Sequence, residues 1–318
     1  MQIKLLLSIL VCASLYGCTS DFDKYNFLQG PRLLAIRAEP STVAIGESTI
    51  IDTLIYAPED ANISYSWSWC PLRAGPTQSW QCSTSQEQLN SLLISFGYEG
   101  EPLGYSLGNT PTITFNHMLA PEMLAQLCMN PGDMLANTAM PNCDQGYPIS
   151  IELNVDIDGH QIRAFKEVNL ALSQDGPVNT NPRIDGVSFG IKNTPHDEAI
   201  AVDENDVPAL REDTKYKLYA DVPEESSEMF IRSFTASGKD PYLSKEGLIL
   251  TWFIGVGETK FMRTNFVENE LGYDVLTANE WEIPPASEIK SSIIPLYLVL
   301  RDERGGVGWL QRSFTVEQ

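Results

Sequence analysis

Apolar and polar residues alternate along several stretches of the chain, most clearly over residues 149–157. Successive side chains of a β-strand point to opposite faces of a sheet, so this alternation predicts a strand with one buried face. Asp158 and Gly159 follow directly, and an Asp-Gly pair between alternating segments is typical of a tight hairpin turn. We therefore expect a return strand over residues 161–172.

Shorter alternating segments extend this pattern toward the N-terminus. Trp67 and Trp69 share one face of a predicted strand over residues 63–70, because they are two positions apart. Turn residues separate this strand from two earlier ones, expected over residues 33–38 and 48–56.

Two long stretches interrupt the strands of this first unit. Residues 71–111 and 120–147 are rich in Gln, Ser, Asn, Met and Pro, and both contain cysteines. Short helices are predicted over residues 85–93 and 121–128. Connections of this length are uncommon in compact domains and are often functional, so we interpret both stretches as insertions that carry specificity.

The order of motifs in the first half of the chain recurs in the second half. Three pairs of segments correspond: 31–33 with 182–184, 65–69 with 248–252, and 156–159 with 301–306. Residues 173–181 have the composition of a linker. Alternation returns over three further segments: 216–222, 296–300 and 309–316.

This repetition predicts an all-β protein with two tandem β-sandwich domains of immunoglobulin-like type. Each unit has an opening strand, a central Trp strand and a closing hairpin. We expect the first domain at residues 31–172, including partly helical, disulfide-containing insertions, and the second at residues 182–318. No cysteine pair is placed to join opposite sheets as in antibody domains, which leaves the strand topology open.

The first residues have the layout of a secretory signal peptide. Lys4 precedes an apolar run over residues 5–15, which is too short to span a bilayer. Gly17 directly precedes Cys18, and the aliphatic Leu15 lies three residues before the cysteine. This arrangement resembles the lipobox at which bacterial lipoproteins are lipidated and cleaved. The alternative is an ordinary signal peptide that leaves Cys18 as a free thiol.

The lipobox resemblance implies a signal peptide at residues 1–17, a palmitate-bearing lipid on Cys18 and a membrane tether over residues 18–30. Several acyl chains on one cysteine give stable anchoring, whereas a single chain binds only marginally. Asp directly after the lipidated cysteine tends to signal inner-membrane retention, and Thr19 stands there instead. The resemblance therefore favours the outer membrane of a Gram-negative cell envelope.

Charge narrows the range of partners. Residues 1–17 contain one lysine and no acid, so the mature chain has 20 Lys and Arg against 42 Asp and Glu, a net charge of −22. Nucleic acid is an improbable partner, because phosphate binding depends on clustered Lys and Arg. The aromatic and aliphatic content is ample for packed cores.

Four cysteines remain after Cys12 leaves with the signal peptide and Cys18 is lipidated. In an oxidising compartment an even number favours disulfides, and short local loops favour Cys70 with Cys82 and Cys128 with Cys143 over the two other pairings. A zinc site is the alternative, but no CxxC spacing or nearby histidine pair supports it.

Catalytic signals are few. The histidines are His117, His160 and His196, and we expect all three to face solvent or cap local structure. The sequence contains no nucleophile elbow, zinc-protease motif, P-loop or dinucleotide fingerprint. We therefore predict a protein that is not an enzyme and needs no cofactor.

Two clusters of charged residues could suggest chemistry. Asp203, Glu204 and Asp206 could offer oxygen ligands to Ca²⁺, although the spacing lacks the EF-hand glycine and terminal glutamate, and a solvated acidic loop is the preferred interpretation. Residues 302–306 could resemble a catalytic loop. We interpret them instead as a turn with glycines in positive φ and charges facing water.

Aromatic residues in the first insertion could form a glycan-stacking platform. These are Trp80, Tyr98 and Tyr105, and their burial decides between a platform and ordinary core packing.

Three segments together carry a resemblance to a group of proteins. PRLLAIRAEP at 31–40, WSWCPL at 67–72 and LRDERGGVGW at 300–309 are similar to lipoproteins of myxobacteria and related predatory or social bacteria. The resemblance spans most of the chain and implies no particular activity. We expect a non-catalytic, membrane-anchored envelope lipoprotein that acts as an interaction or assembly module with a protein partner. A carbohydrate- or envelope-binding role is the alternative, and a hydrolase a distant one.

Overall fold

The computed structural model describes residues 24–129, 141–174, 178–234 and 239–317. The predicted signal peptide and the lipidation residue Cys18 lie outside these ranges. Within the described ranges, no helix is both long enough and apolar enough to cross a bilayer.

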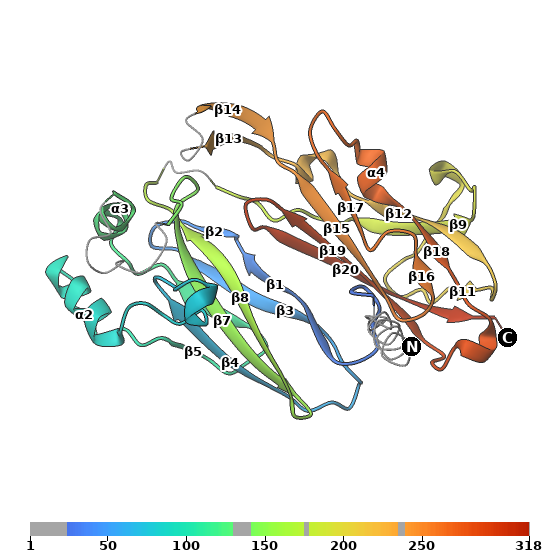
Figure 1. Ribbon diagram of the computed structural model, residues 1–318, viewed down its shortest axis with the longest axis horizontal. Helices are drawn as coiled ribbons and strands as arrows, with labels where there is room; N and C mark the ends of the chain where they lie inside the picture. Colours follow the sequence, from blue (N-terminus) through green and yellow to red (C-terminus); the bar gives the residue numbers. More distant parts are fainter. Residues whose placement is uncertain (1–23, 130–140, 175–177, 235–238, 318) are drawn as a thin grey trace, which may run out of the picture.

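The first half of the chain forms a β-sandwich in which a three-stranded sheet packs against a five-stranded sheet (Figure 1). Across the first sheet the strands are β1 (Arg32–Glu39), β3 (Ser48–Tyr56) and β6 (Ile113–Asn116). Across the second they are β2 (Thr42–Val43), β8 (His160–Leu170), β7 (Tyr147–Ile157), β4 (Ile63–Cys70) and β5 (Ser106–Gly108). Trp67 and Trp69 are buried between the sheets, on the face that the alternation predicted.

The insertions contain the two predicted helices. α2 (Gln86–Ser95) begins at a capping box in which the Ser85 side chain and Gln88 satisfy each other's backbone N–H groups. α3 (Pro121–Met129) buries Met123 and Leu124 against the sandwich core. Both helices lie at the end of the molecule away from the second sandwich (Figure 1).

The second half forms another sandwich, of two five-stranded sheets. Across one sheet the strands are β10 (Ile200–Ala201), β9 (Gly186–Ile191), β12 (Lys215–Asp221), β18 (Ala278–Glu282) and β16 (Glu258–Thr259). Across the other they are β11 (Ala209–Leu210), β20 (Val307–Val316), β19 (Ile294–Asp302), β15 (Leu248–Ile254) and β17 (Arg263–Phe266). Trp252, Trp281 and Phe314 fill the space between them, and a short helix, α4 (Tyr273–Thr277), covers part of the core.

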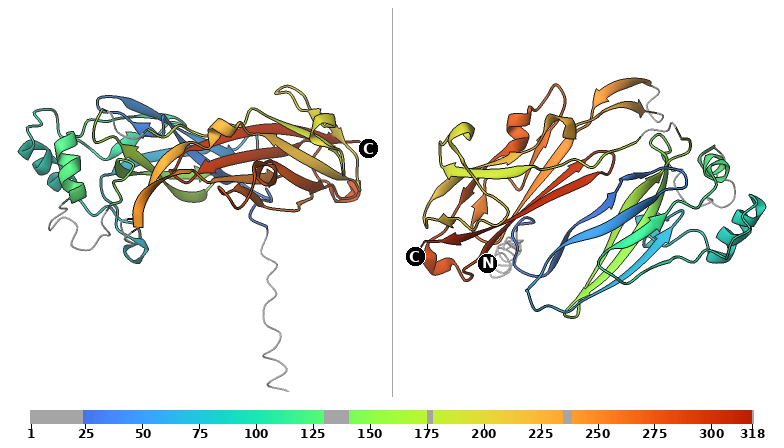
Figure 2. Two further views of the ribbon diagram at one scale, coloured as in Figure 1. Left: turned by 90° about the horizontal axis from the view of Figure 1, so that it is seen from above. Right: turned by 180° about the vertical axis from the view of Figure 1, so that it is seen from behind.

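The internal repeat of the sequence is present in the sheet order. β4, β7 and β8 lie side by side in the first sandwich, as β15, β19 and β20 do in the second. In each, a two-residue strand pairs in parallel with the last long strand, β2 with β8 and β11 with β20. Each half of the chain therefore forms an immunoglobulin-like β-sandwich, and the two lie side by side with β1 next to β20 (Figures 1 and 2).

A separate apolar cluster joins the two sandwiches. Leu34 and Leu54 from the first meet Phe253 and Val299 from the second, and all four are buried. The rings of Tyr56 and Tyr297 pack edge to face, with centroids 6.1 Å apart, at the border of this cluster.

Residues 24–30, the described part of the expected tether, are packed against the second sandwich and do not form a free linker. Leu28 is buried, and its backbone N–H donates to the carbonyl of Ile254 at 2.9 Å. The Asn26 side chain is also buried and donates to the carbonyl of Trp252 at 2.8 Å. The stretch from residue 24 to 30 is therefore docked along β15 of the second sandwich, because its apolar side chains and backbone groups find partners there.

The predicted linker is also packed where it is described. Asn179 is buried, and its carbonyl accepts a hydrogen bond from Ser41 Oγ at 2.5 Å. Asn181 donates to the carbonyl of Ala38 and accepts from the backbone N–H of Val307, which ties β1 to β20. These contacts fix the two sandwiches against each other.

Candidate functional site

The turn between β19 and β20 lies at the junction of the two sandwiches. Asp302 Oδ1 accepts hydrogen bonds from the backbone N–H groups of Arg304, at 2.9 Å, and Gly306, at 2.6 Å. Gly305 has φ +94°, the conformation that favours glycine. The expectation that the charges of this turn face water is wrong for two of the three residues: Asp302 is buried and the Arg304 side chain is only 4% exposed, whereas Glu303 is exposed.

Arg304 holds together the two ends of a neighbouring hairpin. Its Nε donates to Oε2 of Glu246 at 2.7 Å, and its Nη2 pairs with Glu228. Glu228 directly precedes β13 (Met229–Phe234), and Glu246 directly follows β14 (Lys239–Lys245). One guanidinium therefore joins both ends of the hairpin. A planar guanidinium with several N–H donors can bind two carboxylates at once in a fixed geometry, which a lysine ammonium does less well.

The residue before Arg304 in the turn strengthens this attachment. Glu303 accepts from the backbone N–H of Gly247 at 3.2 Å and forms an ion pair with Arg232 of β13. The ring of Phe230 lies beneath the guanidinium groups of Arg232 and Arg304, at 5.1 and 5.2 Å. These cation–π contacts hold one face of the hairpin toward the turn.

Burial shifts the titration of this cluster. It raises the pKa of Glu246 to about 7, although the hydrogen bond from Arg304 opposes the rise. Burial likewise raises the pKa of Asp302 and lowers that of Lys166 in β8 to about 8. Lys166 donates to the carbonyl of Gly305 and so connects the first sandwich to the turn.

The opposite face of the hairpin is open to solvent and apolar. Met229, Ile231 and Leu243 are 50%, 62% and 63% exposed, and Met229 and Ile231 lie on one face because they are two positions apart. Ile231 pairs directly with Leu243 across the two strands. Among the described residues, β13 and β14 pair only with each other, and the hairpin projects from the body of the second sandwich (Figures 1 and 2).

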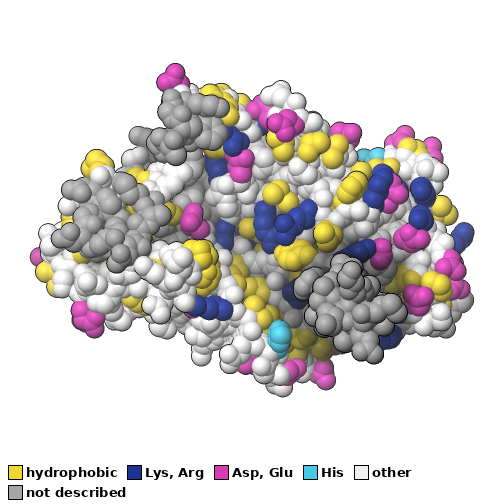
Figure 3. All heavy atoms as spheres, in the orientation of Figure 1, with side chains coloured by type: hydrophobic (Ala, Val, Ile, Leu, Met, Phe, Trp, Pro, Cys, Tyr) yellow, Lys and Arg dark blue, Asp and Glu magenta, His cyan; other side chains and the backbone are white. Residues whose placement is uncertain are grey.

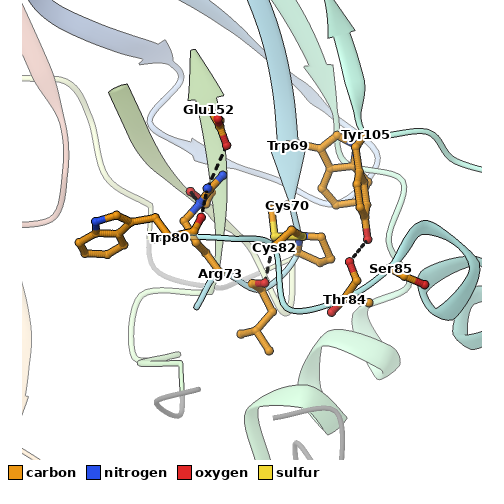
Figure 4. The surroundings of a disulfide bond; sticks show 12 residues. Trp69, Cys70, Arg73, Trp80, Cys82, Thr84, Ser85, Tyr105 and Glu152 are labelled. Atoms are coloured by element: carbon orange, nitrogen blue, oxygen red, sulfur yellow. Dashed lines mark hydrogen bonds and ion pairs between the residues drawn. A yellow bond between two sulfur atoms is a disulfide. The ribbon is translucent and has the colours of Figure 1, made fainter. Parts of the chain in front are cut away.

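A second surface lies on the outer face of the first sandwich, beside the Cys70–Cys82 disulfide (Figure 4). Arg73 donates to Glu152 at 2.9 Å, to Ser150 at 2.8 Å, and to the carbonyl of Trp80. Trp80 has φ 56°, an uncommon conformation for a bulky residue, and its side chain is 45% exposed. The disulfide and Arg73 therefore present Trp80 to solvent.

Phe165 borders Trp80 in this surface. Its ring centroid lies 6.1 Å from that of Trp80 and 4.1 and 4.9 Å from the guanidinium carbons of Arg73 and Arg163. Burial opposes ionisation of Glu152, but hydrogen bonds from Arg163, Asn154 and Arg73 outweigh it and hold the pKa of Glu152 below its ordinary value. The surface thus combines two exposed aromatic rings with a fixed network of charges.

The predicted three-residue platform is not assembled. Tyr98 and Tyr105 are partly buried against the core, and Tyr105 donates its hydroxyl to the carbonyl of Thr84 at 2.8 Å. Figure 4 shows Trp80 and Tyr105 on opposite sides of the disulfide. Sequence reasoning missed Phe165, for which the exposed position of an aromatic residue in the alternation of β8 was the available signal.

The structure also places the predicted cysteines and the acidic loop. Both disulfides have the pairings that short loops favoured, Cys70 with Cys82 and Cys128 with Cys143, so these cysteines are not zinc ligands. Asp203, Glu204 and Asp206 lie in an exposed loop, and no group of three or more His, Cys, Asp or Glu side chains in the described ranges is arranged to hold a metal ion.

The histidines differ in their surroundings. His160 and His196 are exposed, as expected, and His196 stacks on Tyr219 at 4.7 Å. His117 was expected to face solvent or cap a helix, but it is buried with Nε2 3.3 Å from the carbonyl of Ala171. Burial lowers the pKa of His117, which favours the neutral form of the ring.

Comparisons with known proteins add little to this geometry. No family model matches the chain, and no curated protein matches it. Solved structures that are similar include the eight N-terminal Ig domains of Down Syndrome Cell Adhesion Molecule, at 8% identity and a TM-score of 0.22. That match covers 91% of this chain and 25% of the other, so the chain spans about a quarter of its length.

Two bacterial proteins are similar at the same level. Yersinia pseudotuberculosis adhesin InvE has 8% identity and a TM-score of 0.18, with 89% of this chain and 58% of the other covered. The Bacteroides ovatus glucan-utilization protein SGBP-B, solved with a mixed-linkage heptasaccharide, has 8% identity and a TM-score of 0.18, with 91% and 70% covered. Likeness at this level identifies neither a shared ligand nor a shared activity.

Proposed function

We propose that this chain is a non-catalytic, lipid-anchored protein of the cell envelope that acts as an interaction module through its β13–β14 hairpin. The observation that carries the proposal is the exposed apolar face formed by Met229, Ile231 and Leu243. Contiguous exposed apolar surface on a soluble domain commonly marks a protein contact. The lipid on Cys18 and the outer-membrane location complete the proposal and rest on the lipobox resemblance.

The attachment of the hairpin supports this role. Surface apolar residues on a mobile loop would lose conformational entropy on binding, which weakens association. Here Arg304 joins Glu228 and Glu246 at the base of the hairpin, so the position of the two strands is fixed before a partner arrives. The free edges of a two-stranded sheet also offer backbone groups for pairing with a partner strand.

A photo-crosslinking experiment in intact envelopes tests the hairpin. A benzophenone amino acid replaces Ile231 in one variant and Ile94, which is exposed on α2, in the control. We expect a crosslinked protein partner from position 231 only, with its recovery reduced at least tenfold when Leu243→Ser is added. Equal crosslinking from both positions, or none from either, contradicts the proposed contact.

The anchor requires its own measurement. Cells grown with labelled palmitate should label the wild-type chain and leave the Cys18→Ser variant unlabelled, and only the wild type should stay with the outer-membrane fraction after a high-salt wash. A labelled Cys18→Ser chain would contradict lipidation at that residue.

Glycan binding is a second candidate function, and the exposure of Trp80 beside Phe165 favours it. Aromatic rings stack on the apolar faces of sugars, and the surrounding charged groups can donate hydrogen bonds to hydroxyls. Affinity electrophoresis with envelope polysaccharides tests it, using Trp80→Ala and, as a control, Phe261→Ala on the second sandwich. Retardation that only Trp80→Ala abolishes supports glycan binding, and retardation unchanged in both variants contradicts this site.

A further inference from the structure

Three arginines from different elements lie around Tyr25 on the second sandwich. Arg32 of β1 donates from Nη1 to the carbonyl of Tyr25 at 2.5 Å, and the guanidinium of Arg263 lies 4.7 Å from the centroid of the Tyr25 ring. Arg301 of β19 donates to the carbonyl of Leu34 at 2.8 Å and lies close enough to Tyr25 and Arg263 to interact with them electrostatically. We call Arg32, Arg263 and Arg301, with Tyr25, the arginine cluster.

The cluster has an excess of positive charge. None of the ion pairs formed between described residues includes Arg32, Arg263 or Arg301. Burial lowers the pKa of Arg301; Tyr25 opposes this shift, and the nearby positive charge of Arg263 adds to it. In a chain with 42 acidic residues against 21 basic ones, like charges gathered without carboxylates indicate a place for an anion.

The neighbouring lysines differ from the arginines in this respect. Lys24 pairs with Glu258 at 2.6 Å, and Lys260 pairs with Glu280 at 3.0 Å. Their charges are therefore largely balanced within the protein. The local excess of positive charge comes from the guanidinium groups, which match the geometry of phosphate oxygens.

Exposed apolar residues border the arginine cluster. Phe261 and Met262 are 50% and 45% exposed and directly precede Arg263. Together with Tyr25 and Lys260, they line a surface hollow. Figure 3 shows Lys and Arg side chains bordered by hydrophobic ones near the middle of one face. Basic and apolar groups side by side are the composition of surfaces that lie in the headgroup region of a membrane.

The position of the cluster fits a membrane partner. Lys24 lies beside it and is six positions after Cys18. Six extended residues reach about 20 Å at roughly 3.3 Å each. A lipid on Cys18 would therefore keep this face, and not the distant helical insertions, within reach of the bilayer surface.

We propose that the arginine cluster, with Phe261 and Met262, docks on phosphate groups of anionic phospholipids and so orients the anchored protein on its membrane. This inference rests on the proposed lipid anchor for its biological setting. Docking would hold the second sandwich against the bilayer and fix the direction in which the hairpin points.

Vesicle flotation of the mature chain carrying Cys18→Ser tests the docking without any lipid anchor, so its outcome is independent of whether Cys18 is lipidated. The vesicles contain phosphatidylcholine alone or with roughly a third phosphatidylglycerol. We expect binding to the anionic vesicles only, weakened by added salt. A basic residue near an anionic surface contributes about fivefold in affinity, so Arg32→Gln with Arg263→Gln should weaken binding by on the order of 20-fold.

Matched variants separate the alternatives. Arg211→Gln removes an exposed arginine that lies outside the arginine cluster, paired with Glu317, and should leave binding unchanged. Phe261→Ser should weaken binding to vesicles without changing the salt dependence. Equal binding of all variants, or equal binding to neutral and anionic vesicles, overturns the proposal. Displacement from vesicles by millimolar inorganic phosphate would also overturn it, because the cluster would then be a site for a soluble anion.

Discussion

The guanidinium of Arg304 donates from Nε to Oε2 of Glu246 at 2.7 Å, and both side chains are almost completely shielded from solvent. This pair links the turn after β19 to the end of β14, and so links the sandwich to its projecting hairpin. Removal of one partner from a buried ion pair strands the other charge in a medium of low polarity, which costs more than the pair itself contributes.

Arg304→Ala should therefore destabilise the fold strongly. Glu246 and Glu228 would lose their common partner, and we expect the free energy of unfolding to fall by about 3–5 kcal/mol. Urea denaturation followed by tryptophan fluorescence measures it. Arg211→Ala breaks an exposed pair with Glu317 and should change stability by less than about 1 kcal/mol. Similar losses in the two variants would contradict the burial of the Arg304 cluster.

Glu246 should make stability depend on pH. Burial raises its pKa in the folded state to about 7, above the ordinary glutamate value of 4.5. Its contribution is therefore fully present below pH 4.5 and is lost as pH rises through 7. We expect the wild type to lose stability, relative to Glu246→Gln, between pH 5 and 8. His117, with a lowered pKa, has the opposite slope in both proteins and cancels in the difference.

Lys166 should produce the opposite dependence at higher pH. Burial lowers its pKa to about 8 from 10.5, so the stability that it contributes is present above pH 10.5 and is lost as pH falls through 8. The wild type should gain stability between pH 8 and 9.5, and Lys166→Met should show no such gain. Denaturant titrations at half-unit intervals of pH measure both slopes, and parallel curves would refute the assignment.

The two disulfides should have similar effects on stability but different effects on the Trp80 surface. Each closes a loop of 12 or 15 residues, so replacing either pair with serines should cost about 3 kcal/mol in the chain-entropy model. Only the Cys70–Cys82 loop contains Trp80. The tryptophan should become more accessible to acrylamide in Cys70→Ser/Cys82→Ser and not in Cys128→Ser/Cys143→Ser. Equal quenching in both would show that Arg73 alone positions Trp80.

Sequence patterns were sufficient for most of the fold. The alternation over residues 149–157 lies within β7, and the Asp158–Gly159 turn joins it to β8, because period two and turn chemistry are local properties. The helices of the insertions lie where the sequence predicted them, and the disulfide pairings followed from an equally local signal, the short spacing between cysteines.

Burial of charge was decided by tertiary structure alone. Asp302, Glu303 and Arg304 have the composition of an exposed turn, and nothing near them in sequence indicates Glu228, Glu246 or Lys166 as neighbours. These partners are 58 to 139 positions away and meet only because two sandwiches and a hairpin converge on one turn. The sequence by itself determined the long alternating strands, the repeat and the disulfides, whereas no pattern predicted the β13–β14 hairpin. Tertiary packing determined which charged side chains are buried, and therefore which of them form ion pairs and hydrogen bonds with one another.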